Sequence, residues 1–337
     1  MHPNTPPDES NVLEKVETAL KQAVRQQPDL DWEYGTRIKR QKYVYLAVRH
    51  FTPSDQELPV TYSWYKFGAV MPASPQTGTI GPASTQMPTP GARGSSVFST
   101  PFDDLVAFFE EGSLEPPLDE DNWYASDLDF LESFYENHAP AAYRELYLGN
   151  IELRRNLADA IEVLEARWEH ADSQVGQSAT GLDHEHYEAV GRAAARIHLG
   201  IADTSHLGET LPEVRRFTNV VEDAFLVLST TALSDVKESQ GAAIEELERI
   251  YNEWVWEYPA LLISKETAVG PNAPTLRKWS AQKHFSVEDS LSGDIDKAAK
   301  ICFDAGLVPT SSQYPSHGDD IEESVRRLAL STMRRDD

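Results

Sequence analysis

Residues 141–170 read AAYRELYLGNIELRRNLADAIEVLEARWEH, and this stretch indicates the fold class most clearly. Its apolar side chains recur at spacings of four, three and four residues, at Leu157, Ile161, Leu164 and Trp168. Such spacing places them on one face of an α-helix. Gly149 is the candidate point for a break. The stretch therefore predicts a long amphipathic helix that packs against other helices.

The same helical pattern continues on both sides of this stretch. Before it, the pattern covers residues 10–26, 36–51, 102–111 and 126–138. After it come two apolar stripes, made of Val214, Phe217, Val221, Ala224 and Leu228, and of Ile244, Leu247, Tyr251, Trp254 and Tyr258. Pro259 is expected to end the second stripe, because proline removes a backbone donor. Beyond a loop, further helices are expected over 294–305 and 319–335.

We therefore predict a mainly α-helical protein, with a small N-terminal helical module ahead of an acidic helical bundle. Residues 60–65, VTYSWY, favour a strand, so the module is expected to hold a short β-hairpin or wing. Residues 71–99 are rich in Pro, Gly, Ser and Thr and predict a long flexible loop. The expected division is a tail and first helix over 1–33, an acid-poor recognition module over 34–120 that includes the loop 71–100, a helical bundle over 121–258 and a C-terminal helical extension over 259–337.

The composition is strongly acidic. The 337 residues include 30 Lys plus Arg against 55 Asp plus Glu, a formal net charge of −25. This balance resembles that of proteins from salt-accumulating archaea, whose carboxylate-rich surfaces stay hydrated in concentrated salt. The sequence shows no apolar run long enough for a bilayer and no secretory signal at its start, and its single cysteine, Cys302, cannot form an internal disulfide. We therefore expect a cytoplasmic protein of a halophilic archaeon, without a cofactor.

One segment departs from the acidic composition. Between Tyr34 and Phe102 the only acids are Asp55 and Glu57. The same segment holds seven cations: Arg37, Lys39, Arg40, Lys42, Arg49, Lys66 and Arg93. If carboxylates mark the surface that faces solvent, this acid-poor segment faces nucleic acid, another protein or the acidic remainder of this chain. The alternative is a segment with little surface, or one covered by its own loop.

Two runs in this segment resemble a known family. They are RIKRQKYVYLA, residues 37–47, and WYKFGAVMP, residues 64–72. Together they are similar to the opening of the Panacea-type (SocA-like) antitoxin domain and of the related YwgA-like proteins, in which a helix with Gln-Lys and Tyr precedes an aromatic-Lys-aromatic-Gly-Pro element. Gln41, Lys42 and Tyr45 match the helix. Lys66, Phe67 and Gly68 match the second element, where Ala69 replaces the usual proline and a long insertion follows.

The resemblance implies a module that neutralises or regulates a protein partner by contact, without catalytic residues. Read from the residues alone, the segment is also able to form a face of aromatic and cationic side chains. The candidate partner-binding residues are Arg37, Lys39, Arg40, Gln41, Lys42, Tyr45, Trp64, Tyr65, Lys66 and Gly68. The alternative is that Tyr45 and Trp64 are core residues and that Gly68 closes a turn. We predict a macromolecule-binding protein, antitoxin-like or regulatory, that acts through residues 34–102.

An enzyme of another class is the first alternative. Arg192 and His198 are separated by five residues, as in the Arg-x4–6-His motif of HEPN ribonucleases, where the pair supplies a base and a charge stabiliser. This resemblance implies metal-independent RNA cleavage. Ala193 replaces the usual polar residue after the arginine, and the acidic remainder of the chain repels RNA.

Two further interpretations start from other side chains. A winged-helix DNA-binding regulator would use Arg37, Lys39, Arg40 and Lys42 on phosphates, although such contacts weaken as salt rises. A metal site would use His184 and His186. These histidines are two positions apart, however, so on a helix their side chains would point about 200° apart. Asp183 is more simply interpreted as an N-cap. We therefore expect neither a metal nor a catalytic centre.

Overall fold

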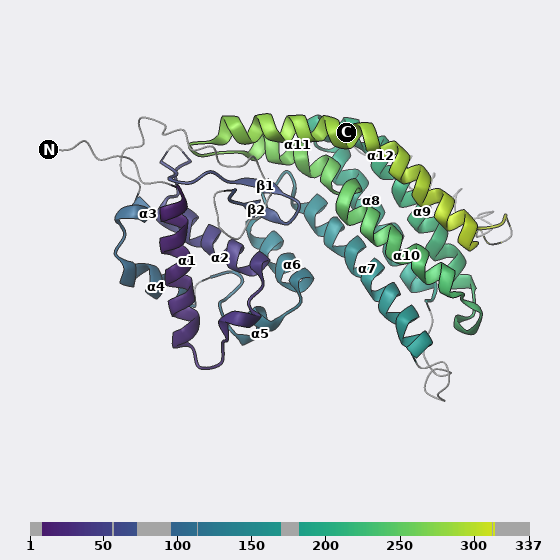
Figure 1. Ribbon diagram of the computed structural model, residues 1–337, viewed down its shortest axis with the longest axis horizontal. Helices are drawn as coiled ribbons and strands as arrows, with labels where there is room; N and C mark the ends of the chain where they lie inside the picture. The colour runs from purple at the N-terminus through teal and green to yellow at the C-terminus, as the bar shows by residue number, and fades with distance from the viewer. Residues whose placement is uncertain are drawn as a thin grey trace, which may run out of the picture.

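Helices dominate the computed structural model, and its two named strands form one small antiparallel hairpin (Figure 1). The structure describes residues 9–55, 57–72, 96–112, 114–169, 182–311 and 313. The prediction of a mainly α-helical fold with a short hairpin is confirmed. Most of the expected loop 71–100, with Arg93, and the whole expected helix 319–335 lie outside the described residues.

The N-terminal module spans residues 9–138 and contains the hairpin. Its elements are α1 (Glu9–Gln26), the short 3₁₀ helix η1 (Trp32–Tyr34), α2 (Arg37–Phe51), β1 (Ser63–Tyr65), β2 (Gly68–Val70), α3 (Ser96–Ser99), α4 (Phe102–Glu110), α5 (Glu120–Tyr124) and α6 (Asp127–His138). Helix α1 packs against both α2 and α4. Its predicted apolar face is buried, at Val12, Val16, Leu20 and Val24. The first helix is therefore part of the module, and the expected boundary at residue 33 does not separate it from the rest.

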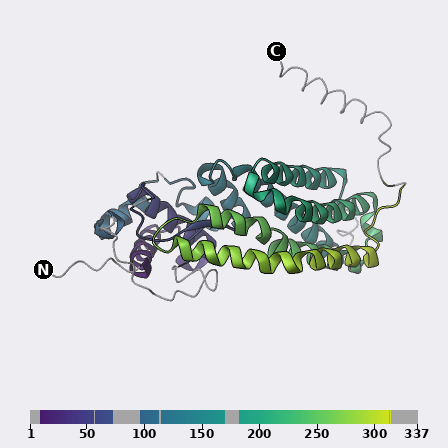
Figure 2. The ribbon, with the colours of Figure 1, turned by 90° about the horizontal axis from the view of Figure 1, so that it is seen from above.

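The helical bundle occupies the other end of the molecule. Its elements are α7 (Arg144–Glu169), α8 (His184–Ala202), η3 (Ser205–Thr210), α9 (Leu211–Thr230), η4 (Leu233–Asp235), α10 (Glu238–Ile250), the π-helical turn η5 (Tyr251–Val255), α11 (Glu257–Thr267) and α12 (Ala273–Ala305). Helix α12 runs along the length of the bundle (Figure 2) and packs against α9, α10 and α11. Residues 259–305 are therefore bundle helices, whereas the sequence had suggested a separate extension.

Gly149 does not break the long helix. Helix α7 continues through it from Arg144 to Glu169. A Cβ atom at Gly149 would lie 3.1 Å from Ile197 Cγ1 of α8, and one at Gly200 of α8 would lie 2.9 Å from Leu146 Cβ of α7. These glycines therefore allow α7 and α8 to pack closely, a requirement that one helix's own sequence does not reveal.

Pro259 does not end the second apolar stripe. Helix α10 ends at Ile250, η5 follows over Tyr251–Val255, and Pro259 lies in the first turn of α11. The first backbone N–H groups of a helix have no partner within that helix, so proline is tolerated there. The stripe is buried as expected at Ile244, Leu247, Tyr251 and Tyr258. The apolar spacing predicted the buried face correctly. The expected role of Pro259 was wrong, because this proline lies at the start of α11 and does not end the preceding helix.

The hairpin joins the module to the bundle. Strand β1 pairs with β2 in the register Ser63↔Val70, Trp64↔Ala69 and Tyr65↔Gly68. On its other side β1 packs against α11, where the Trp64 backbone N–H donates to Thr267 Oγ1 at 2.8 Å. Gly68 has φ +81°, a left-handed conformation that favours glycine. Gly68 therefore closes the turn of the hairpin.

Among the described residues, no helix is both long enough and apolar enough to cross a membrane.

Candidate functional site

The structure places most of the predicted recognition residues inside the protein. Lys39 is 1% exposed and Lys42 is fully buried. Gln41, Tyr45, Trp64, Tyr65 and Gly68 are buried as well, and Arg40 and Lys66 are half-buried. Of these candidates only Arg37 is exposed. The expected recognition face is therefore not on the surface, because its aromatic residues form core and its lysines bind groups of the same chain.

Lys42 is the most deeply buried of these cations. Its Nζ donates to the Ala69 carbonyl of β2 at 2.8 Å and lies 5.8 Å from the centre of the Phe134 ring. Burial lowers the pKa of Lys42 to about 7, because the charged form loses its hydration; the more distant Asp127 opposes this shift. Lys42 therefore ties α2 to the hairpin at an electrostatic cost.

Lys39 caps the C-terminal end of the neighbouring helix α5. Its Nζ donates to the Trp123 carbonyl at 2.8 Å and to the Ala125 carbonyl at 2.6 Å, at the C-terminal end of α5. A cation is favourable beside carbonyls that have no partner in their own helix. Burial lowers the pKa of Lys39, against the opposing fields of Asp127 and Asp129. Lys39 thus serves the module's own structure.

Lys66 and Tyr65 bind a carboxylate of the bundle. Lys66 Nζ lies 3.0 Å from Glu257 Oε2, and Tyr65 Oη donates to Glu257 Oε1 at 2.5 Å. Burial, reinforced by Glu257, raises the pKa of Tyr65. Burial lowers the pKa of Lys66, and Glu257 opposes that shift. At this point the acid-poor segment faces the acidic remainder of the chain, one of the three neighbours that the sequence suggested.

Sequence reasoning missed two buried carboxylates that fix these contacts. Glu9 of α1 accepts hydrogen bonds from the Thr61 backbone N–H at 2.9 Å and from Asn272 Nδ2 at 2.7 Å. Glu257 is the other. It lies alone in the apolar run 254–263, WVWEYPALLI, and a lone acid in such a run is the signal that would have found it. Glu9 stands in a polar stretch and gives no such signal.

Two tyrosines and an arginine of the module face solvent. We call Tyr34, Arg37 and Tyr124 the tyrosine surface. Tyr34 is 68% exposed and Tyr124 43% exposed, and their ring centroids lie 5.6 Å apart at 69°. Tyr124 Oη accepts from the Asp31 backbone N–H at 3.0 Å, which joins α5 to η1.

A packed base holds this surface in place. The rings of Trp32 and Trp123 lie beneath it with 6.1 Å between their centroids, and Trp123 Nε1 donates to the Asp31 carbonyl at 2.8 Å. The Arg40 guanidinium stacks 4.1 Å from the centre of the Trp32 ring and donates to the Trp32 carbonyl at 2.5 Å. A Cβ atom at Gly35 would overlap the Trp123 ring, so only glycine fits there. The exposed rings therefore sit on a rigid support.

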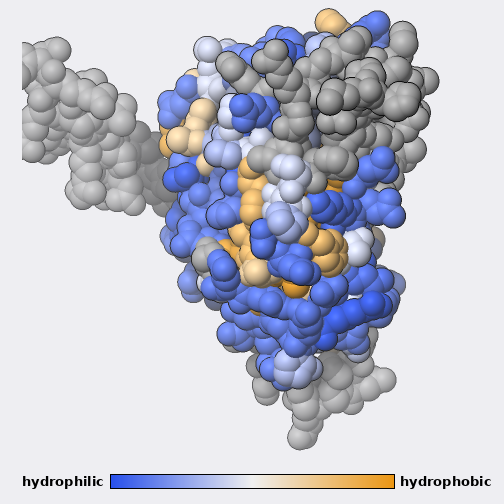
Figure 3. Space-filling model, turned by 90° about the vertical axis from the view of Figure 1, so that its left-hand side faces the viewer, coloured by the Kyte–Doolittle hydropathy of each residue, from blue (hydrophilic) through white to orange (hydrophobic). Residues whose placement is uncertain are grey.

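The surroundings of the tyrosine surface are acidic. Exposed carboxylates flank it: Asp29 and Asp31 lie just before η1, Glu33 lies on η1, and Glu120 and Asp121 lie on α5. Figure 3 views the molecule from the left-hand side of Figure 1 and shows that hydrophilic residues cover most of the described surface on that side as well.

The structure does not bring the two candidate ribonuclease residues together. Both lie on α8, and six residues along a helix place them about 120° apart around its axis. Arg192 is exposed and lies 3.7 Å from Glu188. His198 is half-buried and its Nε2 lies 2.9 Å from Thr218 Oγ1 of α9. Each side chain therefore has a separate partner.

The candidate metal-binding histidines begin the same helix. Asp183 is the N-cap of α8, as expected, and His186 completes a capping box with it. His184 Nε2 lies 3.4 Å from Glu188 Oε1 on the solvent side. Within the described ranges, no group of three or more His, Cys, Asp or Glu side chains is arranged to hold a metal ion.

The comparisons with known proteins concern the whole chain. No curated protein matches it, and no solved structure does. The sequence profile of the family described as "Domain of unknown function (DUF8098)" matches residues 1–334. Because that match includes both the module and the bundle, the chain belongs to the DUF8098 family.

Proposed function

We propose that this protein is a non-catalytic, protein-binding subunit, antitoxin-like or regulatory, and that its tyrosine surface contacts a basic segment of a protein partner. The observation that carries the proposal is the pair of solvent-facing rings, Tyr34 and Tyr124, held on a rigid base among carboxylates. Arg37 of this surface belongs to the segment 34–102 in which the sequence placed the binding function.

The rigidity of the base favours tight contact. Tyrosine offers a large contact area with few rotatable bonds, and it is enriched among the residues that carry most of the binding energy at interfaces. Rings that are already fixed lose little conformational freedom on binding. The bond from the Asp31 backbone to Tyr124 Oη and the stacked Trp32 supply that fixation.

Charge indicates the kind of partner. The five flanking carboxylates outnumber Arg37 and Lys21, whose Nζ lies 5.4 Å from the centre of the Trp32 ring, so the surface attracts lysine- and arginine-rich segments and repels phosphates. Cations of the partner can also stack on the exposed tyrosine rings. The lysines that a DNA-binding function would need, Lys39 and Lys42, bind backbone carbonyls instead. A protein partner is therefore favoured over nucleic acid.

The resemblance to Panacea-type antitoxins supports the architecture of the module and not the choice of partner. The matching residues Lys42, Tyr45 and Gly68 hold α2 and the hairpin together. The shared motif then describes a shared module, and the exposed Tyr34 and Tyr124, which lie outside both runs, select the partner.

A capture experiment with matched variants tests the proposal. Full-length wild type, Tyr34→Ala, Glu33→Lys and the control Phe303→Ala are immobilised, and proteins and nucleic acids retained from a lysate at the host's salt concentration are identified. Phe303 is 70% exposed on α12, far along the chain from the tyrosine surface. A basic protein retained by wild type and by Phe303→Ala, but lost with Tyr34→Ala and Glu33→Lys, is the expected result. Equal retention by all four proteins, or retention of nucleic acid alone, would refute the proposal.

A further inference from the structure

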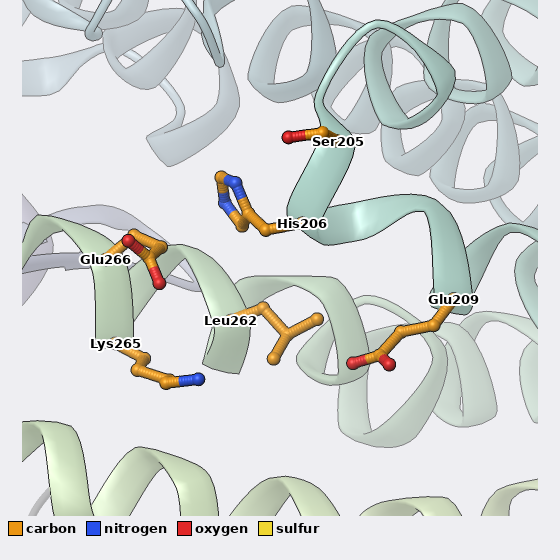
Figure 4. A pocket seen from close by; sticks show the side chains of 6 residues that line it. All are labelled: Ser205, His206, Glu209, Leu262, Lys265 and Glu266. Carbon is orange, nitrogen blue, oxygen red and sulfur yellow. The ribbon is translucent and has the colours of Figure 1, made fainter.

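A pocket of about 270 Å³ lies between η3 and α11 of the bundle (Figure 4). It is lined by Ser205, His206, Glu209, Leu262, Lys265 and Glu266. Leu262 forms an apolar floor, and the side chains of Glu209 and Lys265 point toward it from opposite sides (Figure 4). The pocket lies far along the chain from the tyrosine surface.

The charges around this pocket have no ion-pair partner within the part of the chain that the structure describes. Glu209, Lys265 and Glu266 take part in none of its salt bridges, whereas bundle cations such as Arg216 and Arg249 each contact two carboxylates. One cation and two carboxylates around a single hollow leave both signs of charge open to a ligand.

Two histidines support the pocket from different helices. His206 Nε2 lies 3.1 Å from Tyr143 Oη, which fixes the His206 ring on the pocket wall. Behind the lining, the ring of His284 on α12 stacks on that of Tyr258, with 4.5 Å between the ring centroids. Burial lowers the pKa of His284, Glu209 opposes this shift, and Lys265 adds to it. The wall is thus a built structure, because aromatic contacts hold it from α11 and α12.

We infer that this pocket binds a small zwitterion of the α-amino-acid class. The ammonium group pairs with the carboxylate of Glu209, the ligand's carboxylate pairs with Lys265 Nζ on the opposite side of Leu262, and a short aliphatic side chain lies over Leu262. Sites for drug-sized ligands occupy roughly 300–1,000 Å³. A pocket below that range suits a ligand of amino-acid size, and a ligand with both charges satisfies more of the lining than a simple cation or anion.

Isothermal titration of the full-length protein tests this inference. The probes are glycine, L-alanine, L-valine and L-leucine, with n-butylamine carrying only the cation and butyrate carrying only the anion. We expect at least one amino acid to bind, and to bind about tenfold or more tightly than either single-charge probe. No binding by any amino acid, or equal binding by butylamine, would overturn the inference.

Matched variants locate the binding. Lys265→Met and Glu209→Gln are expected to weaken amino-acid binding by about tenfold or more. The controls Lys278→Met and Glu238→Gln change exposed residues on α12 and α10 and should bind as wild type does. Because the changed residues are exposed, all four variants should fold. Unchanged binding by both pocket variants would place the ligand elsewhere and reject the site. The outcome is independent of partner capture by the tyrosine surface.

Discussion

Two lysines of the module and two arginines of the bundle are used in opposite ways. In the module, Lys39 and Lys42 point inward and donate to backbone carbonyls. In the bundle, Arg216 and Arg249 lie at the surface and pair with carboxylates. At Lys39 and Lys42 the acid-poor segment therefore holds buried cations, and the missing carboxylates around them reflect missing solvent contact. Net charge along a sequence does not by itself locate a binding face.

The largest expected effect follows from deleting a buried cation. Lys42→Ala removes a fully buried side chain and leaves the Ala69 carbonyl without its donor. We expect a loss of about 3–5 kcal/mol in the free energy of unfolding, from the cavity and the unsatisfied carbonyl together. Urea unfolding followed by circular dichroism measures it.

The matched surface change is Arg249→Ala in the bundle, with an expected loss of about 1 kcal/mol or less. Arg249 pairs with Glu246 at 2.7 Å but remains substantially exposed to solvent. Similar losses for the two variants would show that inward and outward cations contribute equally to stability.

Glu257→Gln tests the contact between the two regions. The change leaves half-buried Lys66 without its carboxylate while keeping nearly the same shape. We expect a loss of about 2–3 kcal/mol in the free energy of unfolding, because a largely buried charge loses its partner. The variant Glu245→Gln, which changes an exposed residue of α10, is the control. A loss no greater than that of the control would contradict the proposed link between hairpin and bundle.

The pH dependence of stability should carry the signature of Lys42. Its pKa is about 7 in the folded protein, below the ordinary lysine value of 10.5, so between these values the unfolded chain binds more protons. Stability must then rise with pH in this window, by up to about 1.4 kcal/mol per pH unit from this group. Below pH 7 both states are protonated and the full cost of the buried charge remains.

Comparison with Lys42→Met isolates this contribution. Urea unfolding of both proteins between pH 6 and pH 10 should show wild type gaining stability relative to the variant above pH 7. A difference between the two proteins that stays constant across this range would mean that Lys42 keeps an ordinary pKa and is accessible to water.

The last predicted effect is a gain in stability. Tyr135 is fully buried, and its hydroxyl has no hydrogen-bond partner among the described residues. Tyr135→Phe removes that unsatisfied group and is expected to stabilise the protein by about 1 kcal/mol. Tyr147→Phe is the contrasting variant, since Tyr147 Oη donates to the Tyr65 carbonyl at 2.8 Å and its loss should destabilise. Thermal unfolding should move the two variants in opposite directions.

Local patterns were enough to predict many of the helices but not the direction of each side chain. They also missed the first part of α12, which begins at Ala273 where the sequence analysis expected a helix only from residue 294. The spacing of Val12, Val16 and Leu20 identified a buried face because helical period and burial coincide there. The role of Gly149 depends on a helix some fifty residues away, so its own neighbourhood suggested only a break. The spacing of apolar residues along one helix does not reveal long-range contacts of this kind.

The candidate site was the least predictable part. Lysine is rarely fully buried, so Lys39 and Lys42 were assigned to a surface. Their carbonyl partners at Trp123, Ala125 and Ala69 carry no side-chain signal. Tyr34 marked the start of the acid-poor segment, but its neighbour Tyr124 lies ninety residues further along the chain. Nothing in either local sequence connects them.

Lysine footprinting tests most directly whether Lys39 and Lys42 of the acid-poor segment point inward. The folded, full-length protein is treated with an amine-reactive ester, and the modification rate of each lysine is measured by mass spectrometry. Lys39 and Lys42 should be protected by at least tenfold relative to the exposed Lys278 and Lys300 of α12, and should react at comparable rates only after unfolding. If Lys39 and Lys42 react as fast as Lys300 in the folded protein, these cations face solvent, which would contradict their role as internal donors to backbone carbonyls.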